Sequence, residues 1–169
     1  MGFELNLPLW FHLSIHFTVA LLSGYFLGKY FKKIRLGIVA GILGGFLIDL
    51  DHVLEYFFAF GLRFNLSNFL DGYQFLVSDK IYLVFHGYEY IIVLSILAYL
   101  FRKKENVKIF IIILMISGTI HLLSDTVNNN YPLKNYTISY RAMNNFSAQE
   151  LLNSDQYQKN IELKKELGL

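Results

Sequence analysis

Four groups of histidine and acidic residues lie inside apolar stretches of this sequence or at their ends. The groups are His12 with His16, Asp49 with Asp51 and His52, His86 with Glu89, and His121 with Asp125. Residues three or four apart project from one face of a helix, so each group presents its side chains together. Ionisable groups within membrane segments are costly and mark functional sites by default. Imidazole and carboxylate are the ligands of catalytic zinc, and of manganese or iron in carboxylate-rich sites. The groups therefore predict a site for a divalent metal.

The elements that must position these groups are apolar helices. The 169-residue chain is 54% hydrophobic, with a mean hydropathy of +0.40, which is too apolar for an ordinary soluble domain. Segments long enough to span a ~30 Å hydrocarbon layer, or nearly so, are predicted at residues 9–30, 36–60, 81–101 and 107–127. The second either stops at Asp49 or continues beyond it as a helix. Gly37, Gly41, Gly44 and Gly45 give it a close-packing face. We expect an all-α, multi-pass bundle of about four membrane helices.

The charge distribution predicts the orientation of this bundle. Eight of the fifteen lysine and arginine residues lie around two short loops, at residues 29–35 and 102–108, which the positive-inside rule places in the cytoplasm. Because successive helices alternate in direction, all four groups then reach the opposite leaflet. Both termini and the metal site are predicted to be extracytoplasmic, in the cell (inner) membrane.

The sequence divides into two predicted domains. Residues 1–130 form the metal-binding membrane bundle, and residues 131–169 form a polar, partly helical extracytoplasmic tail. Ser147 and Glu150 match a capping box, so a surface helix is expected to begin there.

We predict six metal ligands that bind one or two ions. Zinc is the preferred metal, and manganese and iron are the alternatives. They are His16, Asp49, His52, His86, His121 and Asp125. Asp51 or Glu89 is the candidate general base or bridging ligand. His12 is either a ligand or an interfacial side chain, and Asp51 and Glu55 are equally well explained as supporting or interfacial charges.

Composition excludes other chemistries. The chain has no cysteine, which removes thiolate ligands, disulfides and a cysteine nucleophile. Its formal net charge of +2, without a basic stripe, gives no support for nucleic-acid binding.

The order of these motifs resembles that of the membrane-bound metal-dependent hydrolase family, which is compared with zinc-dependent phospholipase C and P1-type nucleases. The resemblance is carried by His16, Asp49-Leu50-Asp51-His52, His86 with its acidic neighbour, and His121-Leu122-Leu123-Ser124-Asp125. Ile48 stands where the family commonly has proline, and Gly87 and Glu89 stand where it has arginine and a second histidine. The resemblance implies metal-dependent hydrolysis.

We therefore expect a membrane hydrolase that cleaves a phosphoester of a lipid or lipid-linked substrate. The first alternative is a haem-binding or structural-metal-binding membrane subunit without hydrolase activity. An ion or proton carrier is a further alternative, but it requires carboxylates nearer to mid-membrane.

Overall fold

The computed structural model describes residues 9–129 and 131–168. Within these ranges it contains helices and no β-strand, which confirms the all-α prediction. The chain divides into two compact units, residues 1–48 with 86–132 and residues 49–85 with 133–169. The second unit therefore joins residues 49–85 to the C-terminal tail, a grouping that the sequence did not predict.

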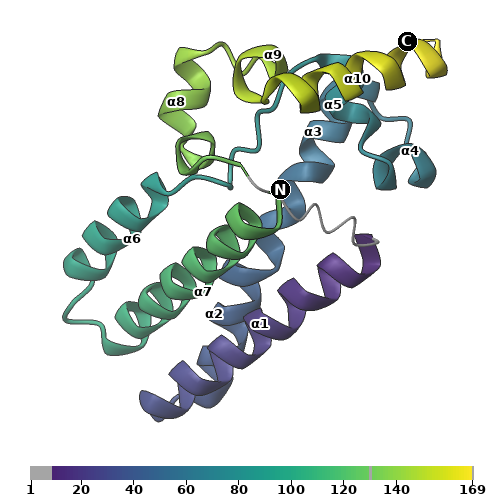
Figure 1. Cartoon of the computed structure of the whole chain (residues 1–169). Coiled ribbons are helices and arrows are strands. Elements are labelled where there is room, and N and C mark those ends of the chain that lie inside the picture. The colour runs from purple at the N-terminus through teal and green to yellow at the C-terminus, as the bar shows by residue number, and fades with distance from the viewer. Residues whose placement is uncertain (1–8, 130, 169) are drawn as a thin grey trace. The chain divides into compact units, whose positions relative to one another are not determined.

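The first unit is built from four helices (Figure 1). They are α1 (Leu9–Tyr30), α2 (Ile34–Gly45), α6 (Glu89–Leu100) and α7 (Glu105–Asn129). Helix α7 packs against the other three helices, and α1 packs along α2. Glycines make the α1–α2 contact possible, because a Cβ atom on Gly37 would overlap the backbone oxygen of Gly24. In the predicted close-packing face, Gly37, Gly41 and Gly45 meet α1, whereas Gly44 meets Leu114 of α7.

Among the described residues, two helical stretches are long and apolar enough to cross a membrane, Ile34–Phe60 and Glu105–Asn128. The first is interrupted, because α2 ends at Gly45 and a 3-10 turn, η1 (Leu47–Asp49), precedes α3 (Leu50–Phe60). The prediction of one helix over residues 81–101 is wrong for residues 81–88, which are not helical. Helix α6 has only 12 residues, or about 18 Å of helix, against a hydrocarbon layer of about 30 Å.

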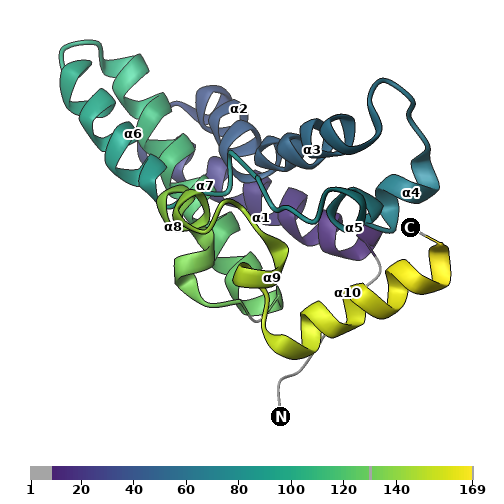
Figure 2. The ribbon, with the colours of Figure 1, turned by 90° about the horizontal axis from the view of Figure 1, so that it is seen from above.

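The second unit contains α3 and further helices (Figure 2). These are α4 (Leu66–Leu70), α5 (Tyr73–Ser78), η2 (Leu133–Tyr136), α8 (Ile138–Met143), α9 (Ala148–Leu151) and α10 (Ser154–Leu167). The non-helical residues 79–85 are bonded to the tail. Ile81 donates its N–H to the Phe146 oxygen at 2.8 Å, and Ala148 donates to the Asp79 oxygen at 3.0 Å.

The predicted surface helix of the tail is present, but it begins differently. Ser147 is the N-cap of the four-residue α9 and its side chain makes no capping hydrogen bond. The capping box lies instead at α10, where the Asn153 side chain accepts from the Gln156 N–H and the Gln156 side chain accepts from the Asn153 N–H. The proposed capping box of Ser147 and Glu150 is therefore wrong, and the chain turns again before the longer helix starts.

Candidate metal centre

Four of the six predicted metal ligands lie together inside the first unit. His16 projects from α1, and His121 and Asp125 project from α7 one turn apart. His86 comes from the non-helical residues just before α6. All four side chains are buried, with His16 and His121 each only 1% exposed. Three segments that are distant in the sequence thus bring three imidazoles to one carboxylate.

The distances in this cluster match those between ligands of one metal ion. The Nε2 atoms of His86 and His121 are 3.3 Å apart, and they lie 3.4 and 3.1 Å from Oδ2 of Asp125. Atoms that share a tetrahedral ion at the 2.0–2.1 Å typical of zinc are separated by about 3.3–3.4 Å. These three atoms therefore form a nearly regular triangle of the size of one face of such a tetrahedron.

His16 approaches the same carboxylate from its other oxygen. Its Nε2 atom lies 3.0 Å from Oδ1 of Asp125, and its ring centroid is 4.1 Å from that of His121. Ligand atoms of His16, His121 and Asp125 all lie within 4.8 Å of one another. His16 can serve either as a fourth ligand or as the donor that orients Asp125. The cluster can hold a metal ion in both cases.

The proton on His121 is fixed by a contact with the backbone. Its Nδ1 atom is 3.0 Å from the backbone oxygen of Gly45, which can only accept, so Nδ1 carries the proton. In a neutral His121 the lone pair of Nε2 would then face an oxygen lone pair of Asp125 at 3.1 Å. A proton or a metal ion must therefore lie between these two atoms.

Two hydrogen bonds outside the cluster fix the segments that carry it. The hydroxyls of Ser23 on α1 and Ser117 on α7 are 2.8 Å apart, one turn before His121. The hydroxyls of Tyr88 and Thr126 are 3.2 Å apart and connect the residues after His86 to α7. Neither bond involves a side chain of the cluster itself.

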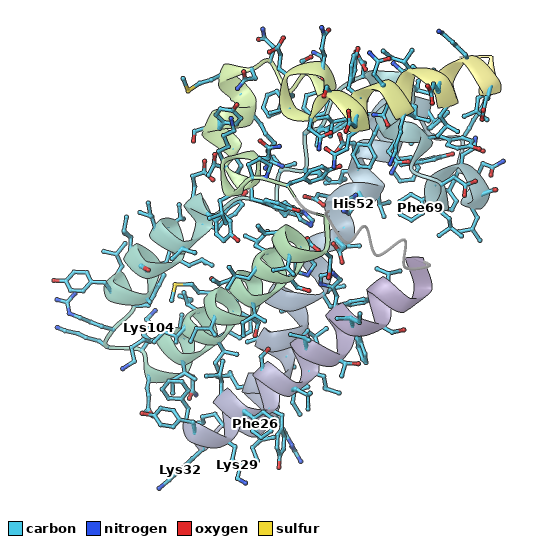
Figure 3. All side chains as sticks on the ribbon, viewed as in Figure 1. Phe26, Lys29, Lys32, His52, Phe69 and Lys104 are labelled. Carbon is cyan, nitrogen blue, oxygen red and sulfur yellow. The ribbon has the colours of Figure 1, made fainter. Side chains whose placement is uncertain are left out.

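The basic residues of the first unit lie at its other end. Lys29 and Lys32 are at the α1–α2 connection and Lys104 is at the α6–α7 connection (Figure 3). With a helical rise of 1.5 Å per residue, His16 lies about 20 Å along α1 from Lys29. The cluster and the basic loops thus occupy opposite ends of one helix bundle.

Asp49 and His52 lie in the second unit. His52 Nε2 is 3.8 Å from Asp49 Oδ1, so the two side chains share a face as predicted for a helical backbone. The His52 ring also meets the ring of Phe75 edge to face, at 5.8 Å between centroids. Their assignment as metal ligands stays a prediction from the sequence.

The carboxylates of Asp51 and Glu55 hold backbone N–H groups in the second unit. Glu55 accepts from Tyr82 at 2.8 Å and from Leu83 at 3.0 Å, and Asp51 accepts from Phe85 at 2.8 Å. Arg141 donates to the Leu83 oxygen at 2.9 Å, and all three charged side chains are buried. These contacts favour the supporting role that the sequence left open for Asp51 and Glu55. They also explain why residues 81–85 are not helical, because their N–H groups find acceptors outside a helix.

His12 and Glu89 are the two other candidate residues from the sequence. His12 lies in α1, but its side chain is outside the described residues. Glu89 is the first residue of α6, so its carboxylate stands at a helix N-terminus, where negative charge is stabilised.

The sequence missed the contacts that support the cluster. Gly45 was assigned only to packing, and the signal for its second role is that a helix ending there leaves carbonyl oxygens without intrahelical donors. Ser117 lies one turn before His121, a spacing visible in the sequence, but its partner Ser23 is 94 residues away.

Comparison with protein-family models, with curated proteins and with solved structures gave no match to this chain.

Proposed function

We propose that this chain is an integral membrane hydrolase that uses a divalent metal, with zinc as the preferred ion. The metal would be held by His86, His121 and Asp125, together with His16. The substrate of the chain is a phosphoester of a lipid or lipid-linked molecule, and we place the chain in the membrane-bound metal-dependent hydrolase family. The observation that carries the proposal is the triangle of two Nε2 atoms and one carboxylate oxygen with edges of 3.1–3.4 Å. It is supported by the Gly45 contact, which directs the unprotonated nitrogen of His121 at Asp125, where a proton or a metal ion must lie between them.

The chemistry follows from the donor set. Three protein ligands leave one tetrahedral position for water, and a bound metal lowers the pKa of that water toward ~7 and polarises a phosphoryl oxygen. In this arrangement the His16 imidazole, with Nε2 3.0 Å from Oδ1 of Asp125, would hold that side of the carboxylate and leave Oδ2 to bind the metal. Asp51 or Glu89 remains the proposed general base. A multi-pass topology of four membrane segments, with the site on the extracytoplasmic side, would give a lipid phosphate access from the headgroup layer.

Metal content is the first test of the site. We expect purified chain to bind zinc, and the His121→Ala and Asp125→Ala variants to lose it. Ser117→Ala is the matched control, because Ser117 is as deeply buried, lies one turn from His121 and is not a ligand. An Asp49→Ala, His52→Ala double variant tests the two predicted ligands of the second unit. Equal zinc in the wild type and in the His121→Ala and Asp125→Ala variants would refute the metal centre.

The second candidate function is a structural metal site, favoured by the presence of four buried donors. If His16 occupies the fourth position, the site is closed as in structural zinc centres. Cobalt substitution separates the two functions, since an added anion such as inorganic phosphate changes the visible spectrum only where a position is open. Release of phosphate or of a phosphorylated headgroup from phospholipid vesicles, lost in His121→Ala, is the expected activity. A cobalt spectrum that does not change when phosphate is added, together with no release from vesicles, would favour the structural role.

A further inference from the structure

The second unit has an exposed apolar surface where α3 runs into α4. Residues 61–80 contain the short helices α4 and α5. Leu62 is 94% exposed and Phe58 is 70% exposed. Phe64, Leu66 and Leu70 are also exposed, and Leu66 and Leu70 share a face of α4. We call these five residues the α3–α4 apolar surface.

An aromatic cluster packs beside this surface and supports it. The Tyr56 ring is buried and stacks on Phe60 at 4.8 Å between centroids, and Phe64 and Phe69 contact it at 5.2 and 5.8 Å. The Tyr56 hydroxyl accepts from the Asn65 N–H at 2.9 Å, and the Asn65 side chain caps α4. The apolar side chains are therefore displayed by a packed structure, which distinguishes them from an unstructured loop.

We propose that the α3–α4 apolar surface docks on lipid, with its side chains at the boundary between headgroups and acyl chains. Three observations favour lipid. The surface begins in the last turns of Ile34–Phe60, one of the two stretches that can cross a membrane, and continues directly beyond its end. Arg63 is exposed between the apolar side chains, which suits a phosphate-rich layer. Tyr56, which belongs to a residue type enriched at membrane interfaces, forms part of its support. The proposal concerns membrane contact and does not depend on the metal centre.

Tryptophan fluorescence provides the test, since the chain has a single tryptophan, Trp10. In a Trp10→Phe background, Leu62→Trp or Leu66→Trp is reconstituted into vesicles of ordinary lipid or of lipid brominated on the acyl chains. We expect brominated lipid to quench both variants and aqueous acrylamide to have little effect. Glu162→Trp, on the polar α10, is the matched control and should show the opposite pattern. Leu22→Trp, exposed on α1, reports whether the chain is inserted in the membrane at all.

Each outcome decides the proposal. Quenching of the Leu62→Trp variant by acrylamide alone would show that the surface faces water. Protection from both quenchers would show that protein covers it, for instance a second copy of the chain. Either result would overturn lipid docking. If Leu22→Trp is quenched by brominated lipid and Leu62→Trp is not, this inference fails while the membrane assignment under the proposed function stands.

Discussion

The Nδ1 atom of His121 lies 3.0 Å from the backbone oxygen of Gly45, the last residue of α2. The last carbonyl groups of a helix have no intrahelical donor, so the oxygen is available to accept this N–H. One helix end thus fixes the protonated nitrogen of a residue on another helix, and directs the other nitrogen at Asp125. The position of the α2 terminus becomes a determinant of the metal centre.

Gly45→Ala is therefore expected to weaken metal binding without touching a ligand. The new Cβ would lie 2.8 Å from the Cβ of Ala20 and 3.4 Å from the Cβ of Ser117, so the end of α2 must shift and carry the carbonyl with it. Loss of such a supporting contact costs roughly 10–100-fold in metal affinity. Competition with a chromophoric zinc chelator measures the change.

A second-site variant provides the control for this effect. Ala20→Gly removes the side chain that the new Cβ meets first, so Gly45→Ala with Ala20→Gly should recover most of the lost affinity. Ala20→Gly alone should bind metal like the wild type. An undiminished affinity in Gly45→Ala would mean that the carbonyl contact does not set the state of His121.

Removal of Asp51 and removal of Glu55 should release different backbone amides. Glu55→Ala is expected to speed hydrogen exchange at Tyr82 and Leu83, and Asp51→Ala at Phe85, because each change removes the acceptor of those N–H groups. A buried N–H without its acceptor costs about 1–3 kcal/mol, which is large enough to be seen as faster exchange. Amide exchange resolved by residue in detergent-solubilised protein measures it.

Each of these two variants serves as the control for the other. The same acceleration at all three amides would indicate general unfolding of the unit and not the loss of one acceptor. If Asp51→Ala leaves Phe85 protected, keeps the metal and abolishes hydrolysis, Asp51 would act as the general base that the sequence suggested.

Local spacing in the sequence was sufficient to predict much of the candidate site. His121 and Asp125 share a face because α7 is a regular helix through both positions, and the length of α1 was predicted correctly, which places His16 on a helix. Residues 81–85 could not be predicted in the same way. The run Ile-Tyr-Leu-Val-Phe is apolar enough to extend α6, but its N–H groups bond instead to Asp51, Glu55 and Phe146, which are 27 to 65 residues away in the sequence. Local patterns contain no information about such distant acceptors.

The Ser23–Ser117 pair should stabilise the bundle modestly and leave the metal centre intact. Ser117→Ala removes a 2.8 Å hydrogen bond between α1 and α7. Polar contacts between membrane helices are worth about 0.6 kcal/mol on average, so a small fall in unfolding temperature is expected. Ser23→Ala should give a similar fall, and the double variant should add little because both changes remove the same bond. Loss of zinc in Ser117→Ala would contradict this and would give the pair a role at the site.

Gly37→Ala and Gly118→Ala should differ strongly in their effect on stability. Helix propensity alone favours alanine over glycine by about 0.8–1 kcal/mol at both positions. At Gly37, however, the new Cβ would overlap backbone atoms of Gly24 and Gly28, and backbone cannot move aside as a flexible side chain can. At Gly118 it would meet one backbone oxygen, that of Gly44, at 3.0 Å, with the next atom at 3.9 Å. Thermal unfolding in detergent should therefore show Gly37→Ala destabilised by about 1–3 kcal/mol, the usual cost of overpacking, and Gly118→Ala much less affected.

Because α1 carries His16, separation of α1 from α2 should also reduce zinc content in Gly37→Ala. Equal stability of the two variants would mean that α1 and α2 do not approach each other as closely as these glycines allow.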